Sequence, residues 1–451
     1  QTPVDIVTDL GDTLRLWNQA DGDHLTEGDD VEKEFAFSSS ADEYISRDNV
    51  GVTTGDKLTI RGVAGEDGSL STINLRSVDS EGNPDRVRSG FEMSNASDMT
   101  VENVRFKNSD YNDGSLFDIS NSDAVLHLNN VTIGDTLSSN AIRNSGLVDM
   151  SGGVVKLASG ITGDGKTEVS GARVEVEDGI SLTQDAIEVK SGSLIMGLGG
   201  KVNSDLTVRT GAEAKVDVNG LTSQVVNGGD LRLFSDGDLS QEVVADDGVK
   251  GTTHILGTIA NKVTLDQDLD VVSGGKFTTR GEQVTGAMNN DGELLLSGSL
   301  SKVVSGAGTT RVDENLRLAQ GAGMSDSQTF DLHDGQITSK DDEIVRYSLG
   351  TMKNEGEFSL DIDAANKLSD LYEVTSTSSG LVKIVDVNFI GTDTNITEDF
   401  KVQVLNTHGT DAIQLSLSDE IKSKKYAVGE TSRDEKDEVK ERTKYSDLYY
   451  N

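Results

Sequence analysis

The feature that most constrains this chain is a two-strand unit that recurs between residues 91 and 150. The first copy occupies residues 91–106, the second residues 117–133, and a less regular third copy residues 142–150. Matching positions in the first two copies lie 26 or 27 residues apart. A β-sandwich also has short strands, but its successive strands differ and no two-strand unit repeats. The repeat therefore predicts a solenoid in which successive copies, or rungs, stack on one another.

Within each copy, apolar and polar residues alternate, as they do in a strand with one buried face. Asn103 and Asn130 occupy equivalent turn positions. Asparagine tolerates the left-handed backbone that such turns need, and stacked Asn side chains can hydrogen-bond to one another. The predicted inward pairs are Phe91 with Phe117, Met93 with Ile119, Val101 with Leu128, and Phe106 with Ile133.

The outward positions predict two polar columns, with neighbouring members about 4.8 Å apart. Such a strip of carboxylates, hydroxyls and an occasional arginine suits hydrogen bonding along an extended glycan or a peptide strand. Loops at 76–88 and 109–114 flank the same rungs and are expected to wall a groove. The predicted binding residues are Glu92, Asp118 and Arg143 in one column, Thr100, His127 and Asp149 in the other, and Asp110, Asn112 and Asp113 in the second loop.

From Gly171 onward the rungs shorten. Glycines at 171, 192, 211 and 229 are separated by 21, 19 and 18 residues, and each predicts the start of a short strand. The pattern returns at Gly275 and Gly292, and the 46 residues from Gly229 to Gly275 have room for two rungs of unassigned phase. The strands predicted after the first four glycines are 173–177, 193–196, 213–218 and 230–234.

Together these patterns predict an all-β chain built around a right-handed parallel β-helix. Residues 1–50 are expected to form an N-terminal cap with an acidic loop, and residues 51–342 the β-helix itself. Residues 343–418 change rhythm and predict a different β module. Residues 419–451 are dense in charges of both signs and predict a solvated linker.

Composition limits the partners that such a chain can have. Hydrophobic residues make up 34% and the net charge is −38, which is typical of disorder unless a repeat shares a thin core between rungs. The acidic excess disfavours nucleic acid and anionic membranes as partners, because both require clustered Lys and Arg. There is no cysteine, no run of about 18 apolar residues and no visible signal peptide, so we expect a mature or trimmed fragment without a membrane-spanning helix.

The rungs from 91 to about 318 resemble the passenger domain of bacterial autotransporter adhesins. The resemblance rests on the phrases Asn-Val-Arg-Phe at 103–106 and Asn-Asn-Asp-Gly-Glu-Leu-Leu-Leu-Ser-Gly at 289–298. Residues 361–363 and 369–371 resemble the autochaperone segment that closes such passengers. The resemblance implies export across the outer membrane and display on a Gram-negative cell surface. It also implies binding to host glycans of the glycosaminoglycan type or to a matrix protein such as fibronectin, or self-association that promotes aggregation and biofilm.

Catalytic and metal-binding patterns are weak in this sequence. No Gly-Asp-Ser-Gly segment of a serine protease is present, and acidic pairs such as Asp29-Asp30 are expected by chance in so acidic a chain. The five histidines are scattered without the spacing of metal ligands. We therefore expect a binding protein that is not an enzyme and has no metal site or cofactor among these residues, and the sequence leaves open whether calcium takes part in binding. A polysaccharide-cleaving β-helix enzyme is the third alternative after adhesion and self-association.

Overall fold

The computed structural model describes most of the chain, with gaps near the two ends. The described residues are 4–6, 32–37, 39–40, 43–46, 50–52, 55–75, 90–107, 115–134, 140–375, 380–391, 400–408, 413–424, 426–434 and 442–450. Their regular secondary structure is nearly all β-strand. They fall into two compact units, unit 1 with residues 1–235 and 241–251, and unit 2 with residues 236–240 and 252–451.

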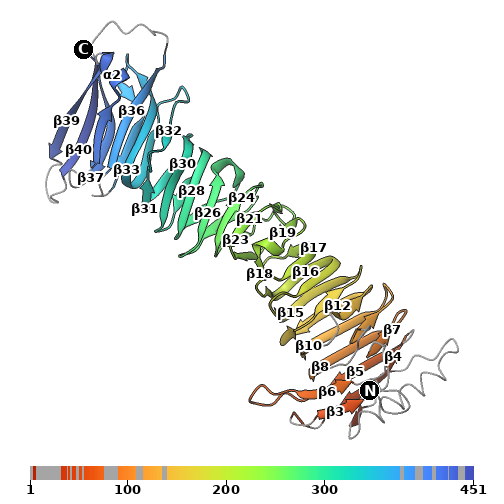
Figure 1. Cartoon of the computed structure of the whole chain (residues 1–451). Helices are drawn as coiled ribbons and strands as arrows, with labels where there is room; N and C mark the ends of the chain where they lie inside the picture. The colour runs from red at the N-terminus through yellow and green to blue at the C-terminus, as the bar shows by residue number, and fades with distance from the viewer. Residues whose placement is uncertain are drawn as a thin grey trace. The chain divides into compact units, whose positions relative to one another are not determined.

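Unit 1 consists of short strands whose described strand-to-strand pairings are parallel. Figure 1 shows β8, β10, β12, β15 and β16 side by side in chain order. The strands of unit 1 are β1 (Val4–Ile6), β2 (Glu32–Ala36), β3 (Glu43–Ser46), β4 (Val50–Val52), β5 (Lys57–Arg61), β6 (Ser71–Leu75), β7 (Phe91–Met93), β8 (Asp98–Phe106), β9 (Phe117–Ile119), β10 (Val125–Ile133), β11 (Asn140–Asn144), β12 (Leu147–Gly152), β13 (Val154–Leu157), β14 (Gly160–Thr162), β15 (Lys166–Val176), β16 (Ser181–Met196), β17 (Lys201–Val208), β18 (Glu213–Asp217), β19 (Val225–Asn227), β20 (Asp230–Phe234) and β22 (Val243–Val244), with the 3-10 turn η1 (Val218–Gly220).

The predicted register of the first rungs is confirmed. Phe91 pairs with Phe117, and Val101 pairs with Leu128, as the 26- and 27-residue spacings require. All the predicted inward residues of these two rungs are fully or almost fully buried. The Phe91 and Phe117 rings stack with their centroids 5.3 Å apart, and Phe106 meets Phe117 edge-on at 5.4 Å. Each buried ring contributes roughly 1.5–3 kcal/mol of hydrophobic stabilisation, so a core only a few side chains wide can hold the rungs together.

The asparagine ladder is also confirmed. Asn103 and Asn130 both have positive φ angles, 56° and 54°. The Nδ2 of Asn130 donates to the Oδ1 of Asn103 at 2.9 Å. Gly153 takes the same left-handed conformation, with a φ of 60°, and a Cβ there would meet the Cβ of Asn130 at 2.5 Å. The ladder therefore ends at a residue that has no side chain.

The predicted strand starts at Gly171 and Gly192 are wrong. Both glycines lie inside longer strands, β15 and β16, rather than at their beginnings. Their φ angles of 128° and 79° are positive, and the register between the two strands shifts next to Gly171. Each glycine thus bends a continuous strand, where a residue with a side chain would be strained. The later prediction of a strand at 230–234 matches β20, and β18 ends one residue before the predicted 218.

The predicted cap over residues 1–50 needs correction. β1 pairs in parallel with β2, and β2 pairs in parallel with β5, so the ladder begins before residue 51. Alternation explains why β2 can join it, since Phe35 is buried while Glu32 is exposed. Most of the expected acidic loop lies outside the described residues.

Two buried amide clusters of the same composition fix corners of the rungs. In unit 1 the cluster is Asn144, Thr167 and Gln184, and in unit 2 it is Asn290, Thr310 and Gln328. In both clusters the Gln Oε1 accepts from the Asn Nδ2 and the Thr hydroxyl, while the Gln Nε2 donates to main-chain carbonyls. The side chains are buried, so these hydrogen bonds compete with no solvent.

Unit 2 continues the pattern of parallel neighbours, with offsets that the sequence did not reveal. β23 pairs with β25 at an offset of 16 residues, and β24 pairs with β26 at an offset of 18. Its strands are β21 (Gly237–Leu239), β23 (Thr252–Ile255), β24 (Thr258–Asn261), β25 (Asp268–Val271), β26 (Lys276–Arg280), β27 (Met288–Asn290), β28 (Glu293–Leu300), β29 (Val303–Ser305), β30 (Thr309–Leu318), β31 (Gly323–Asp331), β32 (Gln336–Thr338), β33 (Arg346–Asp363), β34 (Leu368–Ser369), β35 (Leu371–Val374), β36 (Gly380–Phe389), β37 (Phe400–His408), β38 (Ile413–Leu417), β39 (Tyr426–Asp434) and β40 (Arg442–Tyr450), with the turn η2 (Gly281–Gln283) and the helix α2 (Asp419–Ser423).

The predicted module at 343–418 differs from the preceding rungs in strand length more than in pairing. β33 is long and pairs in parallel with β31, β32, β35 and β36, so the parallel ladder runs into this region. One difference in pairing is an antiparallel pair between β33 and β34. The module also contains β36, β37 and β38, so the described part of residues 343–418 is β structure, as predicted.

The prediction of a linker at 419–451 is wrong. The segment contains α2, capped by the Ser418 hydroxyl, which accepts from the Ile421 N–H. It also contains β39 and β40, which pair with each other and, through β40, with β37 in antiparallel register. Alternating charges are typical of a solvated segment, and they led to the linker prediction. A pair of strands can nevertheless extend the edge of an existing sheet while burying only a few side chains. Leu448, which is fully buried, is one of them.

Candidate binding surface

The first predicted column is assembled as expected. Glu92 pairs in register with Asp118, and Asp118 with Arg143, on β7, β9 and β11. The Arg143 guanidinium lies 3.7 Å from the Asp118 carboxylate, and the Arg143 side chain is half exposed. An exposed pair of this kind contributes little to stability, so the guanidinium can exchange partners at low cost.

The second predicted column places His127 between two carboxylates. His127 pairs in register with Thr100 on one side and Asp149 on the other. Its Nδ1 lies 3.0 Å from Asp149, and its Nε2 lies 3.6 Å from Asp98. The Asp98 carboxylate contributes most to raising the pKa of His127, and Asp149 adds to that effect against the opposing effect of burial. The imidazolium form is therefore favoured here.

The same column extends beyond the residues that sequence reasoning selected. Asp149 pairs with Glu168, Glu168 with Glu188, and Glu188 with Thr207. The period of the repeat was the signal that could have revealed these positions. The misplaced strand starts at Gly171 and Gly192 obscured it, because they divided β15 and β16.

Basic side chains cover the carboxylates of this extension. Lys166 bridges Glu168 at 2.9 Å and Glu188 at 2.8 Å. Lys190 contacts Glu168 at 2.9 Å, and Arg209 contacts Glu188 at 3.0 Å. Burial opposes ionisation of Glu188, yet the hydrogen bonds from Lys166 and Arg209 outweigh it and lower its pKa.

The basic side chains of this extension are much more exposed than the acidic ones. The Glu168 and Glu188 side chains are 12% exposed, whereas those of Lys166, Lys190 and Arg209 are 41%, 45% and 44% exposed. We call these three residues the cationic strip. The carboxylates underneath orient the basic groups, and the ammonium and guanidinium groups are the ones exposed to solvent. Arg209 also contacts Asp246 at 2.6 Å, so three carboxylates balance the three cations, and the cations are the more exposed groups.

Other parts of the predicted site lie outside the described residues. These are the loop at 76–88 and the residues Asp110, Asn112 and Asp113. In the described part of the chain, no group of three or more His, Asp or Glu side chains is arranged to hold a metal ion. No helix among the described residues is long and apolar enough to cross a membrane.

Comparisons with known proteins add little to this picture. No protein-family model matches the chain, and no curated protein matches it. The chain is similar to the crystal structure of the Haemophilus influenzae Hap adhesin, with 10% sequence identity and a TM-score of 0.28. The match covers 92% of this chain but 59% of that one, so the chain spans less than two thirds of that structure. A likeness at this TM-score carries no argument about function.

Proposed function

We propose that this chain is a right-handed parallel β-helix that serves as the passenger of an autotransporter adhesin, closed by an autochaperone-like module at 343–418. In this proposal it is displayed on the surface of a Gram-negative bacterium and binds a host polysaccharide of the glycosaminoglycan type. It acts as a binding protein and not as an enzyme. The observation that carries the binding proposal is the cationic strip on β15, β16 and β17 of unit 1.

The geometry of the strip supports an extended anionic ligand. Lys166, Lys190 and Arg209 are held by carboxylates, so little side-chain entropy remains to be lost when a ligand binds. Because those carboxylates also neutralise part of the positive charge, each contact with a ligand acid group is weak. A polymer that meets several rungs at once gains affinity through multiple contacts, and a single sugar does not. This favours a polyanionic polysaccharide over fibronectin and over self-association between equally acidic chains.

The test is a binding titration of the full chain with chondroitin sulfate chains, using Lys190→Glu as the variant. We expect its affinity to fall about fivefold, because one exposed contact is removed and a repulsive charge is added. Lys156→Glu is the matched control, since Lys156 is an exposed lysine of unit 1 on β13, outside the strip. Equal affinities of the two variants and the unsubstituted chain would reject the strip as the binding surface.

A further inference from the structure

Unit 2 contains a second basic feature, a pocket among β33, β34, β35 and β37. The pocket has a volume of about 420 Å³. Its lining residues are Arg346, Lys367, Leu368, Ser369, Leu371, Lys401 and Gln403. Of these seven described residues, three are basic and none is acidic, which is unusual in a chain with nearly twice as many acidic as basic residues.

Strand pairing builds the floor of this pocket. Arg346, the first residue of β33, pairs with Leu371 at the start of β35. The Ser369 hydroxyl donates to the Gln403 carbonyl oxygen at 2.6 Å, which ties β34 to β37. Ser369 and Leu371 are buried, so the floor is fixed by the sheet.

The walls are exposed and carry the charge. The Arg346 side chain is 68% exposed, although its Nε is ion-paired with Glu373 at 3.3 Å. Lys367 and Lys401 are exposed. Among the described residues, no carboxylate forms an ion pair with Lys367. Leu368 is 52% exposed and gives the rim an apolar surface.

We infer that this pocket binds the acidic sugar unit of a carboxylated polysaccharide. Arg346, Lys367 and Lys401 would receive the carboxylate, the Gln403 amide would hydrogen-bond to ring hydroxyls, and Leu368 would pack on the C–H face of the ring. The pocket differs from the cationic strip because it is concave and has room for a single sugar unit. The inference extends the proposed function to a second site, and it does not require the strip to bind.

Hydrogen exchange with mass spectrometry on the full chain tests the inference, with a hyaluronan hexasaccharide as the probe. We expect the probe to slow exchange in peptides covering 366–371 and 400–405. In the Lys367→Glu/Lys401→Glu double variant this protection should disappear, and the affinity measured by calorimetry for this site should fall about tenfold. Lys401→Arg should retain both the protection and the affinity. A neutral N-acetylglucosamine hexasaccharide should give no protection.

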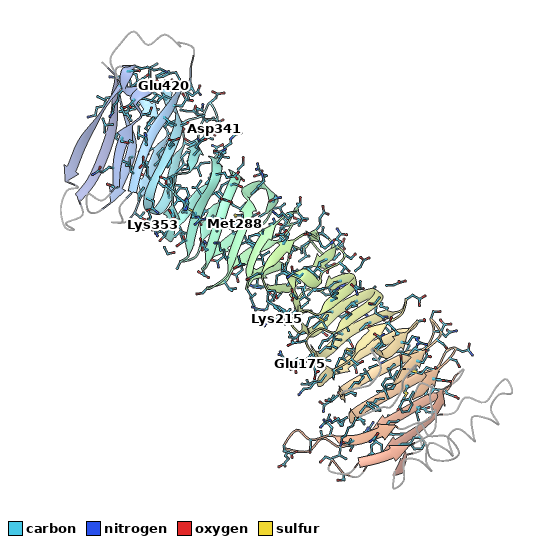
Figure 2. The ribbon with its side chains drawn as sticks, in the orientation of Figure 1. Glu175, Lys215, Met288, Asp341, Lys353 and Glu420 are labelled. Carbon is cyan, nitrogen blue, oxygen red and sulfur yellow. The ribbon has the colours of Figure 1, made fainter. Side chains whose placement is uncertain are left out.

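The matched control is Lys353→Glu. Lys353, labelled in Figure 2, is an exposed lysine of β33 and is not among the residues that line the pocket. Exchange of each variant without the probe must match that of the unsubstituted chain, and Lys401→Ala replaces a charge-reversal variant that fails this check. Absence of protection in the unsubstituted chain, or its persistence in the double variant, would overturn the inference. Loss of protection in Lys353→Glu would also overturn it, because net charge alone would then explain binding. Failure of the strip is recognised separately, since Lys190→Glu leaves the pocket peptides protected.

Discussion

Replacing Gln184 by Leu should open the rungs of unit 1 around β14, β15 and β16. The Gln184 Oε1 accepts from the Asn144 Nδ2 at 2.7 Å and from the Thr167 hydroxyl at 3.0 Å. Its Nε2 donates to the Gly163 carbonyl oxygen at 3.1 Å. Leucine has a similar volume, so the substitution removes the hydrogen bonds without creating a large cavity.

The expected loss of stability follows from the polar groups that remain buried without a hydrogen-bond partner. The Asn144 side chain keeps two partners, because its Nδ2 also donates to the Lys166 carbonyl oxygen and its Oδ1 accepts from the Gly146 N–H, both at 2.9 Å. The Thr167 hydroxyl and the Gly163 carbonyl lose the partners described above. Each buried polar group left without a partner costs about 1–3 kcal/mol, so we expect a loss of about 2–6 kcal/mol in the free energy of local opening.

Native-state hydrogen exchange is the appropriate assay, because stacked repeats need not unfold in one step. Peptides spanning β14 to β16 should exchange faster, while peptides of unit 2 should not change. Gln328→Leu should give the reciprocal result in unit 2, since the Gln328 Oε1 accepts from Asn290 and Thr310. Asn203→Ala, which removes an exposed bond to Thr183, should change the free energy by less than about 0.5 kcal/mol. A Gln184→Leu effect as small as that of the control would refute the reasoning.

Three further predictions concern charge and packing. Burial raises the pKa of Asp370 to about 6, so the folded state holds this proton more tightly than the unfolded state. The stability of unit 2 should therefore rise as pH falls from 7 to 4, by up to about 3 kcal/mol, and thermal unfolding of Asp370→Asn should lack that rise. The raised pKa of His127 stabilises unit 1 below pH 6.5, and this stabilisation is lost as pH rises through the folded-state pKa. Hydrogen exchange of β10 should therefore become faster as pH rises through that pKa, beyond the intrinsic pH dependence of exchange, and His127→Gln should not show this extra change. Phe117→Ala should cost about 3–5 kcal/mol, because its fully buried ring contacts both Phe91 and Phe106, and a denaturation midpoint within error of the unsubstituted chain would contradict this.

The sequence predicted the early rungs well because two independent signals agreed there. The spacing from Phe91 to Phe117 set the register, and alternation set which side chains point inward. The prediction failed where a glycine was compatible with two local structures, the start of a strand or a bend within one. Gly171 was interpreted as a strand start, although a glycine with positive φ can equally bend a strand that continues.

The candidate surface was predicted in part. The columns containing Glu92 and His127 followed from register alone. Which charges reach solvent did not, because Glu168 and Glu188 are covered by Lys and Arg side chains from neighbouring rungs about 20 residues away. The basic pocket of unit 2 was out of reach for the same reason, since Arg346 and Lys401 lie on different strands far apart in sequence.

Distances between paired spin labels test the stacked parallel ladder most directly, and the absence of cysteine in the chain allows clean labelling. Thr59, Thr100 and Thr207 lie in one outward column of unit 1. Thr59 is six rungs from Thr207, and Thr100 is five rungs from Thr207. At about 4.8 Å per rung, double electron–electron resonance should give about 29 Å for labels at Thr59 and Thr207 and about 24 Å for labels at Thr100 and Thr207. The two distances should differ by about one strand spacing, although Thr59 and Thr100 are 41 residues apart in sequence. Distances centred above about 40 Å, or a difference that grows with the intervening sequence, would contradict the ladder.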